Sequence, residues 1–316
     1  MRVNFLVAGG AGFIGSHLVE RLLSLGHNVK VIDDLSTGKI ENIEHILDNI
    51  EFIKASITDF TAVAEAIYDT DVVFHFAANP FVIDTINDPI GSTEVNFTGT
   101  LNLLEAARRE NVKAFIFSSS SAVYGDSKTL PVKEDMLSAP LSPYAAAKLA
   151  SEYFVQLYAD TYELPAVSLR YMNIFGERQN PESLYAAVIP KFIRKMLLGE
   201  RVEIFGDGEQ TRDFLYVENV IDANIVCFNM LFDNKLHSGV FNIGSGEKIS
   251  INQLVKILEA EIGVKADVAY APERKGEIRH SYCDPSKAKE ILNFEPEIHF
   301  KEGIKKMIAY LKSTLV

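Results

Sequence analysis

Two segments of the chain place a lysine four residues after a tyrosine, a spacing that can serve proton transfer. Tyr124 precedes Lys128, and Tyr144 precedes Lys148. The first segment contains Gly-Asp-Ser, which interrupts a helix, whereas the second contains three alanines and continues in strong helix formers. Because residues four apart lie on one face of a helix, we expect Tyr144 and Lys148 to form the working pair.

A phenol needs help to act as a base at neutral pH, since its pKa is normally about 10. An ammonium group one helical turn away favours the phenolate and lowers that pKa. Ser120 stands in a serine-rich run that ends an apolar segment, and its hydroxyl can bond the same substrate oxygen. We therefore predict Ser120, Tyr144 and Lys148 as the catalytic set. The simpler, non-catalytic interpretation is that the serine run forms a solvated turn and that Lys148 is an exposed charge on a helix.

A glycine-rich turn near the N-terminus predicts a site for a dinucleotide cofactor. Gly9, Gly12 and Gly15 follow an apolar run and open a helical pattern, which suits backbone contact with a pyrophosphate. Asp33 ends the next apolar run, where a carboxylate accepts hydrogen bonds from ribose hydroxyls and repels a 2′-phosphate. The residues that follow, Asp34 to Thr37, include no arginine, so we expect NAD rather than NADP.

These residues need a scaffold that brings strand ends together, and the first half of the chain has the pattern of one. Short runs rich in Val, Ile and Phe alternate with helical stretches, which is typical of βαβ units. We predict an α/β fold with a doubly wound parallel Rossmann sheet, which binds ligands at the carboxyl ends of its strands. The expected strands are Phe5–Ala8, Val29–Asp33, Phe52–Ala55, Val72–Phe76, Ala114–Ser118 and Ala166–Arg170, and the expected helices cover roughly 12–22, 60–68, 89–110 and 144–162.

The pattern changes after Arg170, which predicts a second, smaller unit. Helices and strands no longer alternate regularly there, although Ser250 begins a capping box and Asp284-Pro285 marks another helix start. We expect residues 1–170 to form the NAD-binding Rossmann domain. Residues 171–316 would then form mostly a smaller α/β substrate domain, with a segment at about 213–235 returning to the large sheet.

Composition limits the partners of the chain and its location. The 316 residues carry 31 Lys+Arg against 43 Asp+Glu, and a formal charge of −12 disfavours binding to nucleic acid. No apolar stretch approaches the ~20 residues that span a bilayer, and the N-terminus lacks the long apolar core of a cleaved signal. Two cysteines without a CxxC pair and scattered histidines predict neither a disulfide nor a metal site. We expect a cytoplasmic protein without nucleic-acid or membrane partners.

Together these motifs resemble the extended short-chain dehydrogenase/reductase superfamily and, within it, the NAD-dependent UDP-sugar 4-epimerases. The similarity runs almost from end to end. The chain departs from the usual pattern at Ala8, where threonine is common, and at Ser56-Ile57, where Asp-Ile is common. Further landmarks are His75 to Ala78, Asn96, Val123 to Gly125, Arg170 to Asn173, Arg178 to Pro181, Tyr185 to Pro190, Gly206 to Gly208, Arg212 to Phe214 and Arg274 to Glu277.

The resemblance assigns a role to each matching residue, with Ser120, Tyr144 and Lys148 as the catalytic set. Besides the three glycines and Asp33, it implies NAD contacts for Phe13, Ile14, Ser36, Thr37, Gly38, Ser56, Ile57, Ala77, Ala78, Asn96, Ser118, Tyr144, Lys148 and Tyr171. For the sugar of the UDP-sugar it implies contacts with Ser120, with Asn173 (at the sugar or the diphosphate) and with Ser281 beside the C2 substituent of the hexose. Arg212 and Arg274 would contact the diphosphate, and Tyr185, Ala187 and Val188 would contact the uridine.

The resemblance also implies a reaction cycle. Tyr144 takes the proton of the sugar 4-hydroxyl while hydride passes from C4 to NAD, the 4-keto sugar presents its other face, and hydride returns. Serine at position 281 leaves space where a tyrosine would exclude an N-acetyl group. The expected substrates are UDP-GlcNAc and UDP-GalNAc, with UDP-glucose and UDP-galactose as a second pair. A strict UDP-glucose 4-epimerase is the alternative.

Two other functional classes stay open. A nucleotide-sugar 4,6-dehydratase or decarboxylase needs an additional acid and base, and related dehydratases resemble Thr-Asp-Glu where this chain has Ser120-Ser121-Ala122. A dinucleotide sensor without activity is the third interpretation, and such proteins can lose the Tyr or Lys that is intact here.

A homodimer is expected as well, because related epimerases pair through the helices that correspond to 89–110 and 144–162. The residues at helical spacing on the second of these are Ala150, Phe154, Leu157 and Tyr158.

Overall fold

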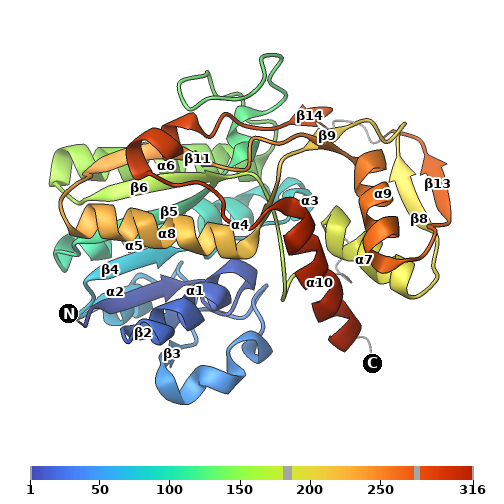
Figure 1. The fold of residues 1–316 in the computed structure, drawn as a ribbon. Helices are drawn as coiled ribbons and strands as arrows, with labels where there is room; N and C mark the ends of the chain where they lie inside the picture. Colours follow the sequence, from blue (N-terminus) through green and yellow to red (C-terminus); the bar gives the residue numbers. More distant parts are fainter. Residues whose placement is uncertain (1, 181–186, 274–277, 315–316) are drawn as a thin grey trace.

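The computed structural model describes residues 2–180, 187–273 and 278–314, and a seven-stranded parallel sheet forms its larger lobe (Figure 1). The predicted α/β fold with a doubly wound parallel Rossmann sheet is confirmed, and each of the six expected strands is present. The seventh strand, at the edge of the sheet, was not expected. In spatial order the strands are β11 (Ser238–Ile243), β6 (Ala166–Tyr171), β5 (Ala114–Ser120), β4 (Val72–His75), β1 (Asn4–Ala8), β2 (Asn28–Ile32) and β3 (Glu51–Ile53).

The strand order reverses at β1, which pairs with β2 on one side and with β4 on the other. Connections that leave β1 and β4 therefore diverge above the carboxyl end of the sheet, where open α/β sheets bind their ligands. The glycine turn follows β1 and residues 76–80 follow β4. The topology thus brings two of the predicted cofactor segments to one crevice.

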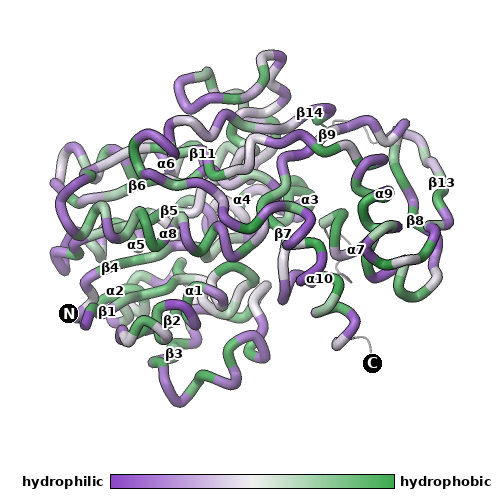
Figure 2. The backbone as a smooth tube through the Cα atoms, in the orientation of Figure 1, coloured by the Kyte–Doolittle hydropathy of each residue, from purple (hydrophilic) through white to green (hydrophobic). Residues whose placement is uncertain are grey.

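Helices cover both faces of the sheet (Figure 1). Helices α1 (Phe13–Ser24) and α8 (Val217–Phe232) pack on one face, and α2 (Phe60–Ile67), α5 (Gly99–Arg109) and α6 (Pro143–Tyr162) pack on the other. Figure 2 shows that the strands between these two layers are mainly hydrophobic. The strands of a parallel sheet are buried on both faces, which explains why their sequences are continuous apolar runs.

Helix α6 begins where its sequence predicts. The Ser142 side chain accepts a hydrogen bond from the backbone N–H of Ala145 at 3.2 Å, and Pro143 occupies the first turn. The inner face of the helix buries Ala147, Ser151 and Val155. This start fixes which residues of α6 point at the end of β5.

The smaller lobe has its own hydrophobic core, which includes Ile193, Leu254 and Ile304. Its described strands form three small sheets. Strand β10 (Phe214–Tyr216) pairs with β7 (Asn173–Phe175), and β13 (Val268–Ala271) pairs with β8 (Val202–Phe205). In the third sheet, β9 (Thr211–Arg212) lies between β12 (Ile249–Ser250) and β14 (His280–Ser281). Its helices are α7 (Val188–Leu197), α9 (Ile251–Ile262) and α10 (Phe300–Thr314).

Short helical turns complete the described chain: η1 (Ile40–Asn42), η2 (Glu44–Asn49), α3 (Val82–Asn87), α4 (Pro89–Thr93), η3 (Glu94–Thr98), η4 (Ser121–Tyr124) and η5 (Ala288–Leu292). Helix α8 and strand β11 belong to the second half of the sequence yet pack on the main sheet. The division into domains at residue 170 stays a prediction.

None of the helices in the described ranges combines the length and the apolar character needed to cross a bilayer. Within the same ranges, no three His, Cys, Asp or Glu side chains gather in a group that could bind a metal ion.

Candidate active site

A cavity of about 560 Å³ lies between the carboxyl end of the sheet and the smaller lobe. One wall comes from the ends of β1, β2, β4, β5 and β6, and the other from β7, α7, β8 and β9. The predicted catalytic set and most of the predicted cofactor residues line it.

The glycine turn is packed so tightly that side chains would not fit. Gly9 has a φ of +83°, and a Cβ there would lie 2.5 Å from the backbone nitrogen of Ala77. A Cβ on Gly15 would lie 2.2 Å from the carbonyl oxygen of Gly9. The turn therefore brings β1, β4 and the start of α1 together, with the amino end of the helix facing the cavity as a site for a phosphate group.

Asp33 is held at the adenosine end of this crevice. Its Oδ2 accepts from the N–H of Ala11 and its Oδ1 from the N–H of Leu35, both at 2.9 Å. Burial raises the pKa of Asp33, and these two hydrogen bonds oppose the rise. Gly38 lies directly beside the carboxylate, where a Cβ would lie 2.9 Å from Oδ1 of Asp33.

Tyr144 and Lys148 lie one turn apart on α6, facing the end of β5. The Nζ atom of Lys148 donates to the carbonyl oxygen of Ser118 at 2.7 Å and lies 6.0 Å from the centre of the Tyr144 ring. The Ser120 side chain lines the same part of the cavity as Tyr144 and acts to lower the pKa of its phenol. All three predicted catalytic residues thus converge on one end of the cavity.

Burial dominates the titration of this pair in the protein alone. It raises the pKa of Tyr144, against the effect of the Ser120 side chain, and it lowers the pKa of Lys148 to about 7. A further positive charge near the phenol, such as that of an oxidised nicotinamide ring, would favour the phenolate.

The other Tyr-x-x-x-Lys segment is not a site. Tyr124 ends η4, Gly125 follows with a φ of +62°, and the exposed Lys128 pairs with Asp126. The buried hydroxyl of Tyr124 donates to Oδ1 of Asn242 at 2.6 Å. Tyr124 and Lys128 therefore point in unrelated directions.

Three predicted cofactor residues stand outside the cavity wall. Ser56 uses its hydroxyl to accept from Thr58, Gly38 supports Asp33, and Asn96 exchanges two hydrogen bonds with the backbone of Asn79. Their contact with NAD stays a prediction. The predicted cofactor residues that line the cavity are Gly9, Gly12, Phe13, Ile14, Gly15, Asp33, Ser36, Thr37, Ile57, Ala77, Ala78, Ser118, Tyr144, Lys148 and Tyr171.

The opposite wall holds most of the predicted substrate residues. Asn173, Ala187, Val188 and Arg212 line the cavity, whereas Tyr185 and Arg274 lie outside the described residues. Ser281 is not part of the lining, but it pairs in register with Arg212 between β14 and β9. Residues paired in this way point to the same face of a sheet. The role of Ser281 stays a prediction.

Asp213 connects three of these substrate residues, and the sequence did not identify it. Its backbone accepts from the N–H of Asn173 and donates to the carbonyl of Ser281, each at 2.9 Å, and Arg212 precedes it. Its fully buried carboxylate accepts hydrogen bonds from the backbone and side chains of Ser245 and Cys283 and from the N–H of Gly246. An acidic residue next to a predicted diphosphate arginine was the signal that could have drawn attention to it.

The residues present fit NAD. The glycine turn packs its backbone closely and lines the cavity without side chains, and Asp33 is fixed by two backbone N–H groups. Tyr144, Ser120 and Lys148 stand at the other end of the same cavity. The arrangement can bind a dinucleotide in extended form and move a proton at an oxygen of a second ligand beside it.

A family model described as GDP-mannose 4,6 dehydratase matches residues 6–307 of the chain. A curated relative from Methanocaldococcus jannaschii, described as a putative UDP-glucose 4-epimerase, is 40% identical over 310 residues, which cover 98% of each chain.

Two solved structures are similar along almost the whole chain. The UDP-N-acetylglucosamine 4-epimerase of Methanobrevibacter ruminantium, in complex with UDP-N-acetylmuramic acid, is 39% identical with a TM-score of 0.94 and 99% of both chains covered. The UDP-glucose 4-epimerase of Thermus thermophilus, in complex with NAD, is 35% identical with a TM-score of 0.88, covering 98% of this chain and 99% of that one.

Proposed function

This chain belongs to the family described as GDP-mannose 4,6 dehydratase, within the extended short-chain dehydrogenases/reductases, and we propose that it interconverts UDP-GlcNAc and UDP-GalNAc. The coarser assignment is that of an NAD-dependent UDP-sugar 4-epimerase. UDP-glucose and UDP-galactose form a second candidate pair. The observation that carries the proposal is the convergence of Ser120, Tyr144 and Lys148 on one end of a cavity whose opposite wall includes Arg212.

Each residue of the set has a defined task at the 4-hydroxyl of the sugar. NAD, when bound, supplies a reversible hydride acceptor for C4. Tyr144 takes the proton from O4 and later returns it, while the Ser120 hydroxyl holds the same oxygen. Lys148, anchored to the carbonyl of Ser118, stabilises the phenolate by its charge. The guanidinium of Arg212 suits a diphosphate oxygen, so the sugar can turn about its phosphate linkage between the two half-reactions.

The positions of the carboxylates in the cavity wall favour epimerisation over elimination. A 4,6-dehydratase needs an additional carboxylate beside the ketone, at the position that follows Ser120. Among the described lining residues, the carboxylates are those of Asp33 and Asp34 at the end of β2 and Glu203 on β8. The turn after Ser120 carries Ser121 and Ala122 instead. No described lining residue beside Tyr144 therefore supplies the second acid–base group.

The preference for N-acetylated sugars rests on Ser281. This residue lies in register with Arg212, so its side chain shares a face with a residue of the cavity wall. A small side chain there leaves space for a bulky C2 substituent, whereas a tyrosine would overlap with it.

Product identification tests the proposal. The purified protein is incubated without added NAD with UDP-GlcNAc, UDP-GalNAc, UDP-glucose, UDP-galactose and UDP-glucuronate, and the products are identified by anion-exchange chromatography and NMR. We expect the 4-epimer in the first two reactions. A dehydrated or decarboxylated product would assign another reaction class, and turnover of only the glucose/galactose pair would assign the alternative substrates. Tyr144→Phe serves as the inactive control.

A further inference from the structure

Glu152 is a buried carboxylate beside the reacting groups, and the proposed reaction does not use it. It lies on α6, one helical turn after Lys148, with only 3% of its surface exposed. Its Oε2 accepts from Nη2 of Arg170 at 2.7 Å, and its Oε1 accepts from Nε of Arg170 at 2.9 Å and from the Ser119 hydroxyl. A buried charge that is this fully bonded needs a reason to be there, because apolar side chains of the same volume would often be as stable.

These contacts tie α6 and β5, the two elements that carry the catalytic set, to β6. Ser119 and Arg170 are register partners on β5 and β6, and both bond the one carboxylate from α6. Ser119 stands between Ser118, whose carbonyl binds Lys148, and Ser120, which acts to lower the pKa of Tyr144. The position of Glu152 therefore determines how α6 faces the end of β5.

Lys148 carries its charge in a buried position, which makes that charge costly. It is 2% exposed, and burial lowers its pKa. Its Nζ faces the Ser118 carbonyl, the Phe117 ring at 4.8 Å and the Tyr144 phenol. From β4 it is faced by His75, which burial keeps neutral by lowering its pKa well below the usual value. The negative charge of Glu152 acts in the opposite direction and raises the pKa of Lys148.

We propose that Glu152 is a positioning residue that acts through Lys148: it keeps a negative charge one helical turn from the ammonium and holds the Ser118–Ser120 segment against α6. The inference deepens the proposed function and rests on it. Arg170 completes the device by pairing with the buried carboxylate of Glu152 through its Nε and Nη2 atoms.

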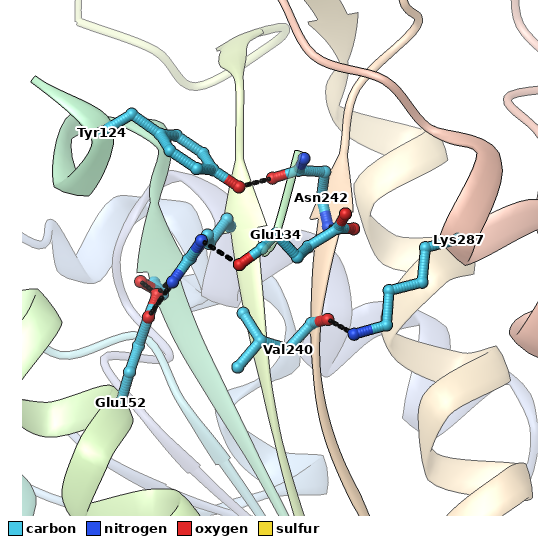
Figure 3. Close-up of polar contacts among 8 residues, drawn as sticks. Tyr124, Glu134, Glu152, Val240, Asn242 and Lys287 are labelled. Carbon is cyan, nitrogen blue, oxygen red and sulfur yellow. Dashed lines mark hydrogen bonds and ion pairs between the residues drawn. The ribbon is translucent and has the colours of Figure 1, made fainter. Parts of the chain in front are cut away.

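Arg170 also reaches a second carboxylate residue on the far side of the cluster, which supplies a matched control. Figure 3 shows Glu152 at one end and Glu134, Tyr124 and Asn242 at the other. Arg170 donates to the backbone oxygen of Glu134 at 3.4 Å and its guanidinium lies 4.7 Å from the centre of the Tyr124 ring. The side chain of Glu134 accepts from the N–H of Asn242 at 2.7 Å. Removing the charge of Glu134 therefore perturbs the same cluster without touching the helix of Lys148.

The test is the pH profile of kcat for the holoenzyme and for Glu152→Gln, Glu152→Asp and Glu134→Gln, with bound NAD per chain and the thermal midpoint measured for each. Activity falls on the alkaline side as Lys148 loses its proton. Without the carboxylate charge the ammonium is less stable, so the alkaline limb of Glu152→Gln should move to lower pH by about one pH unit. Glu152→Asp keeps the charge and should keep the limb near that of the natural enzyme, as should Glu134→Gln.

The outcomes separate this inference from the proposed function. If the natural enzyme makes no epimer, the proposed function fails. If it does and Glu152→Gln loses kcat by the same factor at every pH, Glu152 is merely structural and the inference is rejected. If Glu152→Gln does not fold, Ser119→Ala carries the test, because the carboxylate then keeps its charge with one donor fewer. The pH at which kcat of Ser119→Ala falls on the alkaline side should stay the same or become higher. A shift of that pH to a lower value would also reject the proposal.

Discussion

The ammonium nitrogen of Lys148 lies 6.0 Å from the centre of the Tyr144 ring, and both side chains leave α6 on the face that meets the end of β5. The ammonium donates its hydrogen bond to the carbonyl oxygen of Ser118 at 2.7 Å. Lys148 therefore influences Tyr144 by its charge rather than as a proton-transfer partner. Ser120 acts on the same phenol by opposing the rise of its pKa.

Tyr144→Phe should abolish most turnover while the fold and NAD binding persist. The change removes only the hydroxyl that takes the substrate proton, and the loss of a general base typically costs about 100- to 10,000-fold in rate. The measurements are kcat and the amount of NAD released on denaturation. Tyr124→Phe is the control, since it removes a buried hydrogen bond to Asn242 and should cost about 1 kcal/mol of stability with little effect on rate. A Tyr144→Phe enzyme with a near-natural rate would overturn the assignment of the base.

Asp213→Asn should weaken substrate binding without affecting NAD content. An amide in this position turns one acceptor into a donor that faces either the Ser245 or the Gly246 N–H group. The segment that carries Arg212 would shift, so we expect KM for the UDP-sugar to rise about tenfold or more, consistent with about 1.5–3 kcal/mol for hydrogen bonds to a charged group. Asp267→Asn, on the exposed surface of the same lobe, provides the comparison. Equal KM values in the two variants would remove Asp213 from the substrate site.

The sequence predicts the parts of this site that depend on local pattern. The glycine turn, Asp33 and the Tyr144–Lys148 pair each follow from residue types at short spacing, and each lines the cavity. Apart from the place of Asp213 next to Arg212, local pattern does not reveal the roles of Asp213 and Glu152. Their partners, such as Ser245 and Arg170, are distant in the chain and share no periodicity with them.

The seventh strand was missed for a related reason. Strand β11 includes Asn242 in the middle of a short apolar run, and a polar residue there argues against a buried strand. Its amide is satisfied by the Tyr124 hydroxyl and by the carbonyl of Val132, which the fold brings from elsewhere in the chain. Tertiary partners therefore permit a strand that its local sequence does not favour.

The protein should form a homodimer, with a mass about twice 35.1 kDa by light scattering at micromolar concentration. On α6, Phe154 packs on Phe97 in the monomer's own core, with ring centres 5.3 Å apart, whereas Leu157 is 47% exposed. Ile90, on the neighbouring α4, is 82% exposed. Such side chains stabilise a pair of subunits when the two helix faces meet. Leu157→Glu should shift the mass toward the monomer, and Leu137→Glu, at a loop position that is 91% exposed, should not. A natural protein of single-chain mass would reject the dimer.

Ser281→Tyr should separate the two substrate pairs. Ser281 shares a sheet face with Arg212, and its carbonyl is fixed by the N–H of Asp213 at 2.9 Å, so a larger side chain at this position cannot easily move its backbone away from the substrate wall. Overlap with a packed group costs about 1–3 kcal/mol, and we therefore expect kcat/KM for UDP-GalNAc to fall about tenfold or more, with a change of no more than a few-fold for UDP-galactose. Ser281→Ala should leave both values near those of the natural enzyme, because it adds no volume. An equal loss on both sugars would show that position 281 supports the fold instead of reading the C2 substituent, and a natural enzyme that does not convert UDP-GlcNAc would end the proposed preference altogether.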